Sequence, residues 1–358
     1  MSAPTNPALA VRKPILYGDA THWGLVEADT LLLLPQLPDG CIDAVVCDPP
    51  YNLSFGGAAW DGRDIRDAVG AASDRLSDGE AFERWTERWA SECRRLLRPG
   101  GYLVAFGAPR TFHRLVAGVE DAGLEIRDVI SWLYGSGMPK SRRLRGDRGT
   151  ALKPAIEPLV VARKALDGST EDNVARHGTG VLNIGEGRVH DDTYHDAAGQ
   201  LIGRWPANVA WSHHPACRSA RCHPVCPKPL LDQGQKNAPS RFFYSSKAST
   251  SEREAGCEQL PKRAAAVFST KKGTPVARRG NHHPTPKPID LMRWLTRLVC
   301  PAGGVVLDPF AGSGSGGAAA MLEGRGYLGI EREPEFARIA VARIGHWASE
   351  AAPPEDRS

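Results

Sequence analysis

The stretch IDAVVCDPPY, residues 42–51, carries the clearest signal of the fold class. Five of its first six residues are apolar, which predicts a buried strand, and Asp48 follows directly. A second stretch, VVLDPFAGSG at residues 305–314, has the same arrangement of an apolar strand followed by an acidic residue and a proline. In open α/β sheets, ligands bind beyond the carboxyl ends of the strands. Both stretches therefore predict functional residues at one edge of a parallel sheet.

Strands and helices alternate around both stretches. We expect strands at 25–28, 42–47, 102–106, 305–307 and 327–330. We expect helices at 30–37, 79–97, 111–122, 288–299, 316–323 and 334–346. This alternation is typical of a doubly wound, parallel α/β sheet.

The middle of the chain lacks such periodicity. Residues 135–282 are rich in Gly, Pro, Ser and basic residues, and they are too many for one loop inside a compact domain. We expect an inserted, loop-rich domain between two parts of one catalytic domain, residues 14–134 and 283–348. The end segments 1–13 and 349–358 are expected to be disordered.

The charge of the chain is unevenly distributed. Residues 135–282 contain 24 Lys and Arg against 13 Asp and Glu, whereas the rest of the chain contains 21 against 28. A basic middle between acidic ends favours contact with a polyanion, although a solvated basic face is the alternative. Candidate phosphate contacts are Arg142, Arg143, Arg145, Lys271 and Lys272.

Composition excludes several classes of protein. No apolar run approaches the ~20 residues of a membrane span, and the amino-terminal MSAPTNPALAVRKP lacks an apolar signal core. The 8 cysteines among 358 residues do not suggest a disulfide scaffold. We expect a cytoplasmic protein without a membrane partner, either a monomer or a homodimer.

The glycine-rich turn after the second strand limits the kind of ligand. It lacks the GK[ST] ending of a P-loop, and a GxGxxG spacing can be matched only as Gly312, Gly314 and Gly317. The preceding Asp308 argues against that reading. Glycines let a flat ligand approach the backbone, and Glu331 is placed to accept hydrogen bonds from ribose hydroxyls. The pattern fits any adenosine cofactor, whether NAD or S-adenosylmethionine.

The Asp-Pro-Pro-Tyr turn favours S-adenosylmethionine over NAD as the cofactor. An exocyclic base amine is a poor nucleophile, because its lone pair is delocalised into the ring. The Asp48 carboxylate and the Pro49 carbonyl can each accept one N–H, which frees the lone pair for a methyl carbon. Pro49 and Pro50 stiffen the turn, and Tyr51 offers a face on which an extruded base can stack. The alternative is a proline-rich turn with a solvent-exposed tyrosine.

The two motifs, in this order and with a large insertion between them, resemble the β group of site-specific DNA amino-methyltransferases, in particular phage-type members. The resemblance covers roughly residues 20–134 and 283–346. It implies a circularly permuted, Rossmann-like sheet that binds S-adenosyl-L-methionine. Gly312 and Asp48 would then end adjacent strands, which would bring the transferable methyl group beside the amine.

The resemblance also implies roles for individual residues. The catalytic set is Asp48, Pro49, Pro50 and Tyr51. The cofactor set is Asp29, Thr285, Lys287, Asp308, Phe310, Gly312, Gly314 and Glu331. Ala28 stands where the family usually has glycine. The segment 153–158 resembles a family segment near the target base.

Several reactions fit this resemblance. Asp as the first motif residue favours adenine in this family, whereas Ser favours cytosine. We therefore expect methylation of the 6-amino group of adenine in double-stranded DNA by base flipping, with the 4-amino group of cytosine as the alternative. Methylation of RNA or of a protein amide is a further alternative, although those enzymes have the unpermuted order. A non-catalytic DNA-binding protein is disfavoured by the intact Asp48 and Tyr51.

The stretch HHPACRSARCHPVC, residues 213–226, offers ligands for a structural zinc ion. The candidate ligands are Cys217, Cys222, Cys226 and His214, and either of the two other histidines of the stretch could replace His214. The spacing is not a standard zinc-finger pattern, and reduced cysteines in an irregular domain are the alternative. A loop-rich segment with a thin core would gain stability from such an ion.

Overall fold

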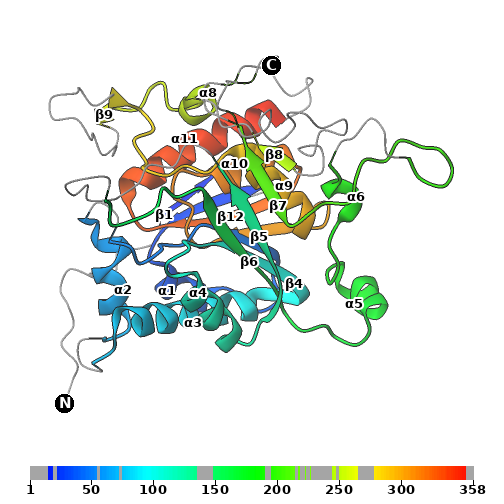
Figure 1. Cartoon of the computed structure of the whole chain (residues 1–358), viewed down its shortest axis with the longest axis horizontal. Helices are drawn as coiled ribbons and strands as arrows, with labels where there is room; N and C mark the ends of the chain where they lie inside the picture. The colour runs from blue at the N-terminus through cyan, green and yellow to red at the C-terminus, as the bar shows by residue number, and fades with distance from the viewer. Residues whose placement is uncertain are drawn as a thin grey trace.

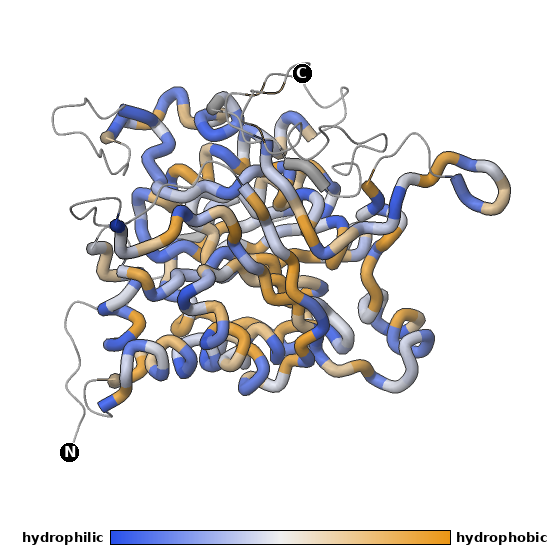
Figure 2. Tube along the Cα trace, in the orientation of Figure 1, coloured by the Kyte–Doolittle hydropathy of each residue, from blue (hydrophilic) through white to orange (hydrophobic). Residues whose placement is uncertain are grey.

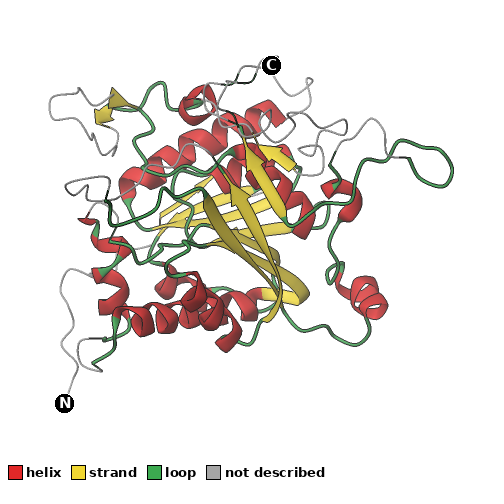
Figure 3. Ribbon diagram, viewed as in Figure 1, coloured by secondary structure: helices red, strands yellow, loops and turns green. Residues whose placement is uncertain are grey.

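The computed structural model shows a mixed α/β protein built on one large sheet. The structure describes residues 15–18, 22–54, 57–71, 75–134, 148–189, 195–213, 217, 222, 226, 244–246, 250–264 and 278–351. Within these ranges the main sheet has ten strands in the order β1-β2-β12-β11-β3-β4-β6-β5-β7-β8. The sheet lies at the centre of the molecule (Figures 1 and 3). The strands are β1 (Ile15–Gly18), β2 (Trp23–Glu27), β3 (Ile42–Cys47), β4 (Leu97–Phe106), β5 (Glu125–Leu133), β6 (Ile156–Arg163), β7 (Val209–Ser212), β8 (Tyr244–Ser246), β11 (Val305–Asp308) and β12 (Gly326–Glu331). A separate two-stranded sheet pairs β9 (Arg263–Ala264) with β10 (Arg278–Arg279).

Strand order confirms the circular permutation. The strands β2, β12, β11, β3 and β4 are successive neighbours and run parallel. The carboxyl-terminal strand β11 lies beside β3, with Leu307 opposite Val45. The end of the chain therefore supplies the two strands between β2 and β3, as expected for a permuted Rossmann-like sheet.

Helices cover both faces of the sheet (Figures 1 and 3). One face packs against α9 (Ile289–Val299), α10 (Ser315–Leu322) and α11 (Pro334–Ala351). The other packs against α1 (Thr30–Leu33), α2 (Arg63–Ala68), α3 (Asp78–Leu96) and α4 (Phe112–Asp121). Figure 2 shows apolar stretches in the strands and in the helices beside them. Among the described residues, no helix is long and apolar enough to span a membrane.

Helix α3 shows how local sequence determines one of these layers. Ser77 and Glu80 form a reciprocal capping box at its start, which satisfies backbone donors that the first turn leaves unpaired. The apolar residues of its predicted face are all buried: Phe82, Trp85, Trp89, Cys93 and Leu96. The helix ends where Leu97 begins β4, so the expected stop before Pro99 is confirmed.

The sheet contains strands from the middle segment, residues 135–282, that the sequence did not predict. Strand β6 lies between β4 and β5 and pairs antiparallel with both, and β7 and β8 extend the same sheet beyond β5. The expected boundary at residue 134 therefore lies inside the sheet rather than at its edge. The reason is that β6 contains the continuous apolar run LVVA, which is typical of a fully buried strand and shows no alternation.

The remaining described helices are short. They are η2 (Leu34–Gln36), η4 (Ala59–Asp61), α5 (Thr170–His177), α6 (Ile184–Gly187) and α8 (Thr250–Glu254). Helix α11 runs to Ala351, so residues 349–351 are helical and not part of a disordered tail. The other residues of the two expected tails lie outside the described ranges.

Candidate active site

Four neighbouring parallel strands bring their carboxyl ends to one edge of the sheet. In spatial order, β2 is followed by Asp29, β12 ends at Glu331, β11 ends at Asp308, and β3 is followed by Asp48. Two of these ends are bonded directly, because the Ala28 amide donates to the Glu331 carbonyl at 3.1 Å. The structure thus places three of the predicted cofactor residues, Asp29, Asp308 and Glu331, in one row with the predicted catalytic turn.

The predicted catalytic turn is held by a buried carboxylate. Asp61, 2% exposed, accepts hydrogen bonds from the Tyr51 amide at 2.7 Å and from the Leu53 amide at 3.2 Å. The Thr111 hydroxyl donates to the Tyr51 carbonyl at 2.8 Å. These contacts fix the backbone of Tyr51 from both sides. The sequence analysis missed Asp61, because nothing in its local sequence indicates that η4 folds back onto the turn.

Asp48 and Tyr51 belong to a cluster of four polar side chains. The Lys287 ammonium donates to the Asp48 carboxylate at 2.7 Å and lies 3.1 Å from the Glu157 carboxylate. The Tyr51 hydroxyl lies 2.6 Å from Asp48 Oδ1 and 3.0 Å from Glu157 Oε2, so its single proton can be donated to either acid. Lys287 also donates to the Tyr51 hydroxyl at 3.1 Å. One buried cation is therefore shared by two acids and a phenol.

The packing around Lys287 strengthens this cluster. The Lys287 side chain is 7% exposed, and its ammonium lies 4.9 Å from the centre of the Phe106 ring. Lys287 was predicted among the cofactor residues, and in the structure its ammonium contacts the predicted catalytic residues Asp48 and Tyr51. Glu157, on β6, was not among the predicted catalytic residues. The signal for it was the likeness of residues 153–158 to a segment near the target base.

Burial shifts the protonation of the cluster. Burial raises the pKa of Asp48, and the Glu157 charge adds to this, while Lys287 and the hydrogen bonds lower it in part. Burial and the two neighbouring acids raise the pKa of Tyr51 well above its ordinary value, so the phenol stays protonated. Burial alone would lower the pKa of Lys287, but Asp48 and Glu157 raise it overall, so the amine stays charged.

These opposing effects predict the pH dependence of two variants. Protonation of Asp48 removes its negative charge and turns one of its two acceptor oxygens into a donor, so we expect kcat/KM to rise as pH increases through its pKa and then to level off. Lys287→Met removes the charge that lowers this pKa, so the acid limb should move to higher pH. Glu157→Gln removes a charge that raises it, so the limb should move to lower pH. Both variants are compared with the wild type in pH–rate profiles at saturating cofactor. A shift of the acid limb in the same direction in both variants would contradict this assignment.

The glycine turn is tied to Glu331. The Gly312 amide donates to Glu331 Oε2 at 2.8 Å, and the Glu333 amide donates to Oε1 at 2.8 Å. Burial raises the pKa of Glu331 to about 7. Each carboxylate oxygen has a second lone pair, so Glu331 can still accept hydrogen bonds from ribose hydroxyls. Gly312 has φ +53°, and a β-carbon there would lie 3.0 Å from His283 Nε2, so this position requires glycine.

Three other predicted cofactor residues have structural contacts. Asp308 is buried and accepts from the Phe310 amide at 3.1 Å and the Tyr327 hydroxyl at 3.2 Å. The partly buried Phe310 ring lies 5.4 Å from the rings of both Trp85 and Trp89. A β-carbon at Gly314 would lie 2.8 Å from the Cα of a residue in α11. These contacts support the shape of the turn, which is separate from any contact with a ligand.

The last two predicted cofactor residues are Asp29, which lies in this row, and Thr285, which precedes α9. Asp29 caps α1 by accepting from the Leu31 amide at 2.9 Å, and its carboxylate lies 4.0 Å from Arg332. Thr285 is exposed, and its amide donates to His283 Nδ1 at 3.4 Å. Burial, with a smaller effect from Lys287, lowers the pKa of His283 to about 3, so this imidazole is neutral.

The chain matches a family model described as DNA methylase, for N6 and N4 methyltransferases, over residues 42–342. It is a member of the N6/N4 DNA methylase family. This methylase is 23% identical to the Type II methyltransferase M.HindIII of Haemophilus influenzae, over 90% of its own chain and 94% of that protein. It is 20% identical to the Type II methyltransferase M2.DpnII of Streptococcus pneumoniae, over 89% of its own chain and 88% of that protein.

A solved structure shares the fold of the methylase. The PvuII DNA methyltransferase, described as cytosine-N4-specific, superposes with a TM-score of 0.53. The two are 15% identical over 90% of this chain and 86% of that one. At this identity the likeness shows the fold alone.

The remaining predicted site residues of the methylase are only partly described. The candidate phosphate contacts Arg142, Arg143, Arg145, Lys271 and Lys272 lie outside the described residues, as does the candidate metal ligand His214. The three candidate cysteines do lie together, but the histidine beside them is His213.

Proposed function

We propose that this methylase transfers the methyl group of S-adenosyl-L-methionine to the 6-amino group of adenine in double-stranded DNA. The observation that carries the proposal is the adjacency of Asp48, in the Asp-Pro-Pro-Tyr turn at the end of β3, to the glycine turn at the end of β11. Asp in the first motif position favours adenine over the alternative acceptor, the 4-amino group of cytosine.

The cofactor residues fit this role. The edge formed by Asp29, Glu331 and Gly312 presents two carboxylates and a close backbone turn, which suit the hydroxyls and the flat base of an adenosine group. When bound, S-adenosyl-L-methionine supplies an activated methyl group on a positively charged sulfur. Glu331 and Asp29 orient the adenosine part, and the turn at Gly312 leaves room for it.

The catalytic residues act on the amine of an extruded base. Tyr51 provides the stacking surface, and the Asp48 carboxylate and Pro49 carbonyl each accept one N–H of the amine. S-adenosyl-L-methionine would supply the methyl carbon to the amine nitrogen with its sulfur as the leaving group, and Asp48 accepts the proton that the nitrogen gives up. Both Asp48 oxygens already accept one hydrogen bond, and each keeps a second lone pair for the amine.

The first test is the base modified in cells. We expect genomic DNA from cells that express the methylase to contain 6-methyladenine, detected by nucleoside mass spectrometry and located by methylation-sensitive sequencing at one recurring sequence. The matched control is the Asp48→Ala variant, which should leave the DNA unmodified. Detection of 4-methylcytosine alone in the wild-type sample would favour cytosine as the acceptor base. The absence of any modified base would exclude methylation of DNA.

We also propose that the basic middle of the chain binds DNA phosphates. Residues 135–282 carry a net charge of +11 and the rest of the chain carries −7, so the rest alone would repel duplex DNA. Removing one side chain that binds a phosphate should reduce the slope of log K against log salt by about 0.9.

The basic cluster at residues 142–145 is the place to test this. Replacing Arg142, Arg143 and Arg145 together with alanine should weaken binding to every DNA sequence and flatten the salt slope, with little change in cofactor affinity. Fluorescence anisotropy across a salt series measures this. An unchanged slope would mean that other residues make the phosphate contacts. A large loss of cofactor binding would assign the segment to the catalytic site.

A further inference from the structure

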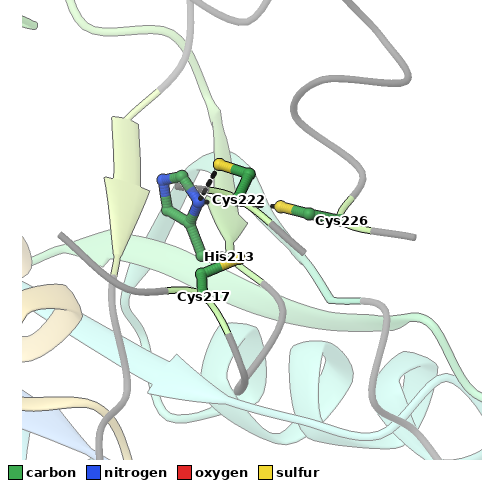
Figure 4. A group of neighbouring side chains, drawn as sticks. All are labelled: His213, Cys217, Cys222 and Cys226. Atoms are coloured by element: carbon green, nitrogen blue, oxygen red, sulfur yellow. Dashed lines mark hydrogen bonds between the residues drawn. The ribbon is translucent and has the colours of Figure 1, made fainter. Parts of the chain in front are cut away.

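Four metal-binding side chains converge just beyond strand β7. His213 directly follows β7, and Cys217, Cys222 and Cys226 come within the next 13 residues. The His213 ring nitrogen and the three sulfur atoms all lie within 4.8 Å of one another (Figure 4). The four residues are at least partly buried, and Cys226 is fully buried. All eight cysteines of the chain are described, and none forms a disulfide bond.

Two nitrogen-to-sulfur distances match those of a tetrahedral zinc site. The Nδ1 atom of His213 lies 3.5 Å from Cys222 Sγ and 3.6 Å from Cys226 Sγ. With zinc–sulfur bonds of about 2.3 Å and zinc–nitrogen bonds of about 2.0–2.1 Å, the nitrogen-to-sulfur edge of a tetrahedron is about 3.6 Å. A thiol is only a weak hydrogen-bond donor, so these contacts alone explain poorly why three sulfurs gather around one imidazole.

We propose that His213, Cys217, Cys222 and Cys226 bind one structural zinc ion. Four protein ligands complete a tetrahedral shell and leave no position for water or substrate, which is the arrangement of structural rather than catalytic zinc. The histidine in this set is His213 and not the neighbouring His214.

The position of the site in the sheet indicates what the ion stabilises. Strand β7 runs parallel to β5, and Trp132 Nε1 on β5 donates to the Ser212 hydroxyl at 2.8 Å, so the end of β7 is fixed. Both strands run in the same direction as β3, because β6 between β4 and β5 is antiparallel to both. His213 therefore lies at the same edge of the sheet as Asp48. Zinc would tie Cys217, Cys222 and Cys226 to His213 at this edge of the sheet.

Metal analysis of the purified full-length protein tests the ligand set. We expect one zinc ion per chain after purification without an affinity tag that binds metal. His213→Ala and Cys222→Ser should each weaken zinc binding at least about 10-fold. The controls are His214→Ala, the adjacent histidine, and Cys41→Ser, a partly buried cysteine outside the cluster, and both should retain the metal.

Cobalt provides a readout that does not depend on how well each variant folds. Replacement of zinc by Co²⁺ in the wild-type protein should produce the visible absorption bands and thiolate-to-cobalt charge transfer of a tetrahedral thiolate site. The proposal is overturned if the wild-type protein holds no zinc and shows no such spectrum, if His214→Ala loses the metal while His213→Ala keeps it, or if Cys222→Ser binds zinc as tightly as the wild type.

Discussion

Asp48→Ala should slow methyl transfer by at least ~100-fold, because the variant loses the charged group that acts on the base amine. Cofactor affinity should change little, since the contacts of Asp48 are with Lys287 and Tyr51 rather than with the glycine turn. Folding should tolerate the change, because Lys287 keeps Glu157 as an ionic partner at 3.1 Å.

Two measurements separate these effects. Single-turnover kinetics gives the rate of transfer, and calorimetry gives the affinity for S-adenosyl-L-methionine. Asp48→Asn is the matched variant, since its amide oxygen still accepts one hydrogen bond, and it should retain more activity than Asp48→Ala. Loss of cofactor binding in Asp48→Ala with the rate at saturation unchanged would place Asp48 in the cofactor site instead.

Gly312→Val should abolish cofactor binding before it affects any later step. The left-handed φ of +53° disfavours a branched residue, and the added β-carbon would lie 3.0 Å from the His283 ring. The turn would then have to shift away from Glu331, which holds the Gly312 amide at 2.8 Å. We expect the dissociation constant for S-adenosyl-L-methionine to rise beyond the measurable range.

Gly303→Val is the control for backbone strain. Gly303 has φ +71°, and a β-carbon there would meet nothing within 4 Å. It precedes β11 and so lies at the opposite end of the strand from Gly312. Both variants should lose stability through strain, but only Gly312→Val should lose the cofactor. Equal loss of cofactor binding in the two would mean that strain, and not the shape of the turn, explains the result.

The sequence predicted the catalytic sheet well because its signals are local. The strand at Ile42–Cys47 has the predicted bounds, and the face of α3 is buried as its periodicity indicates. The placement of β11 beside β3 was implied by the resemblance of the two motifs, in their order, to the methyltransferase family. Each of these features depends on residues that are neighbours in the chain or on a motif with a fixed structural context.

The contacts that complete the site are between distant residues, and the sequence did not predict them. Glu157 reaches Tyr51 from 106 positions away, and Lys287 reaches Asp48 from 239 positions away. Strand β6 carries Glu157 into the sheet, but its apolar run lies in a region that otherwise resembles a loop. Asp61 is closer to the turn, yet its role depends on how η4 folds back. The choice between His213 and His214 depends on side-chain direction at the end of β7, which spacing alone does not determine.

The most direct test of the central claim uses the purified protein, duplex DNA and S-adenosyl-L-methionine with a deuterated methyl group. After digestion to nucleosides, mass spectrometry should find the deuterated methyl group on 6-methyladenine, and the Asp48→Ala protein should yield none. A deuterated methyl group found only on 4-methylcytosine, or label transferred equally well by Asp48→Ala, would contradict the account.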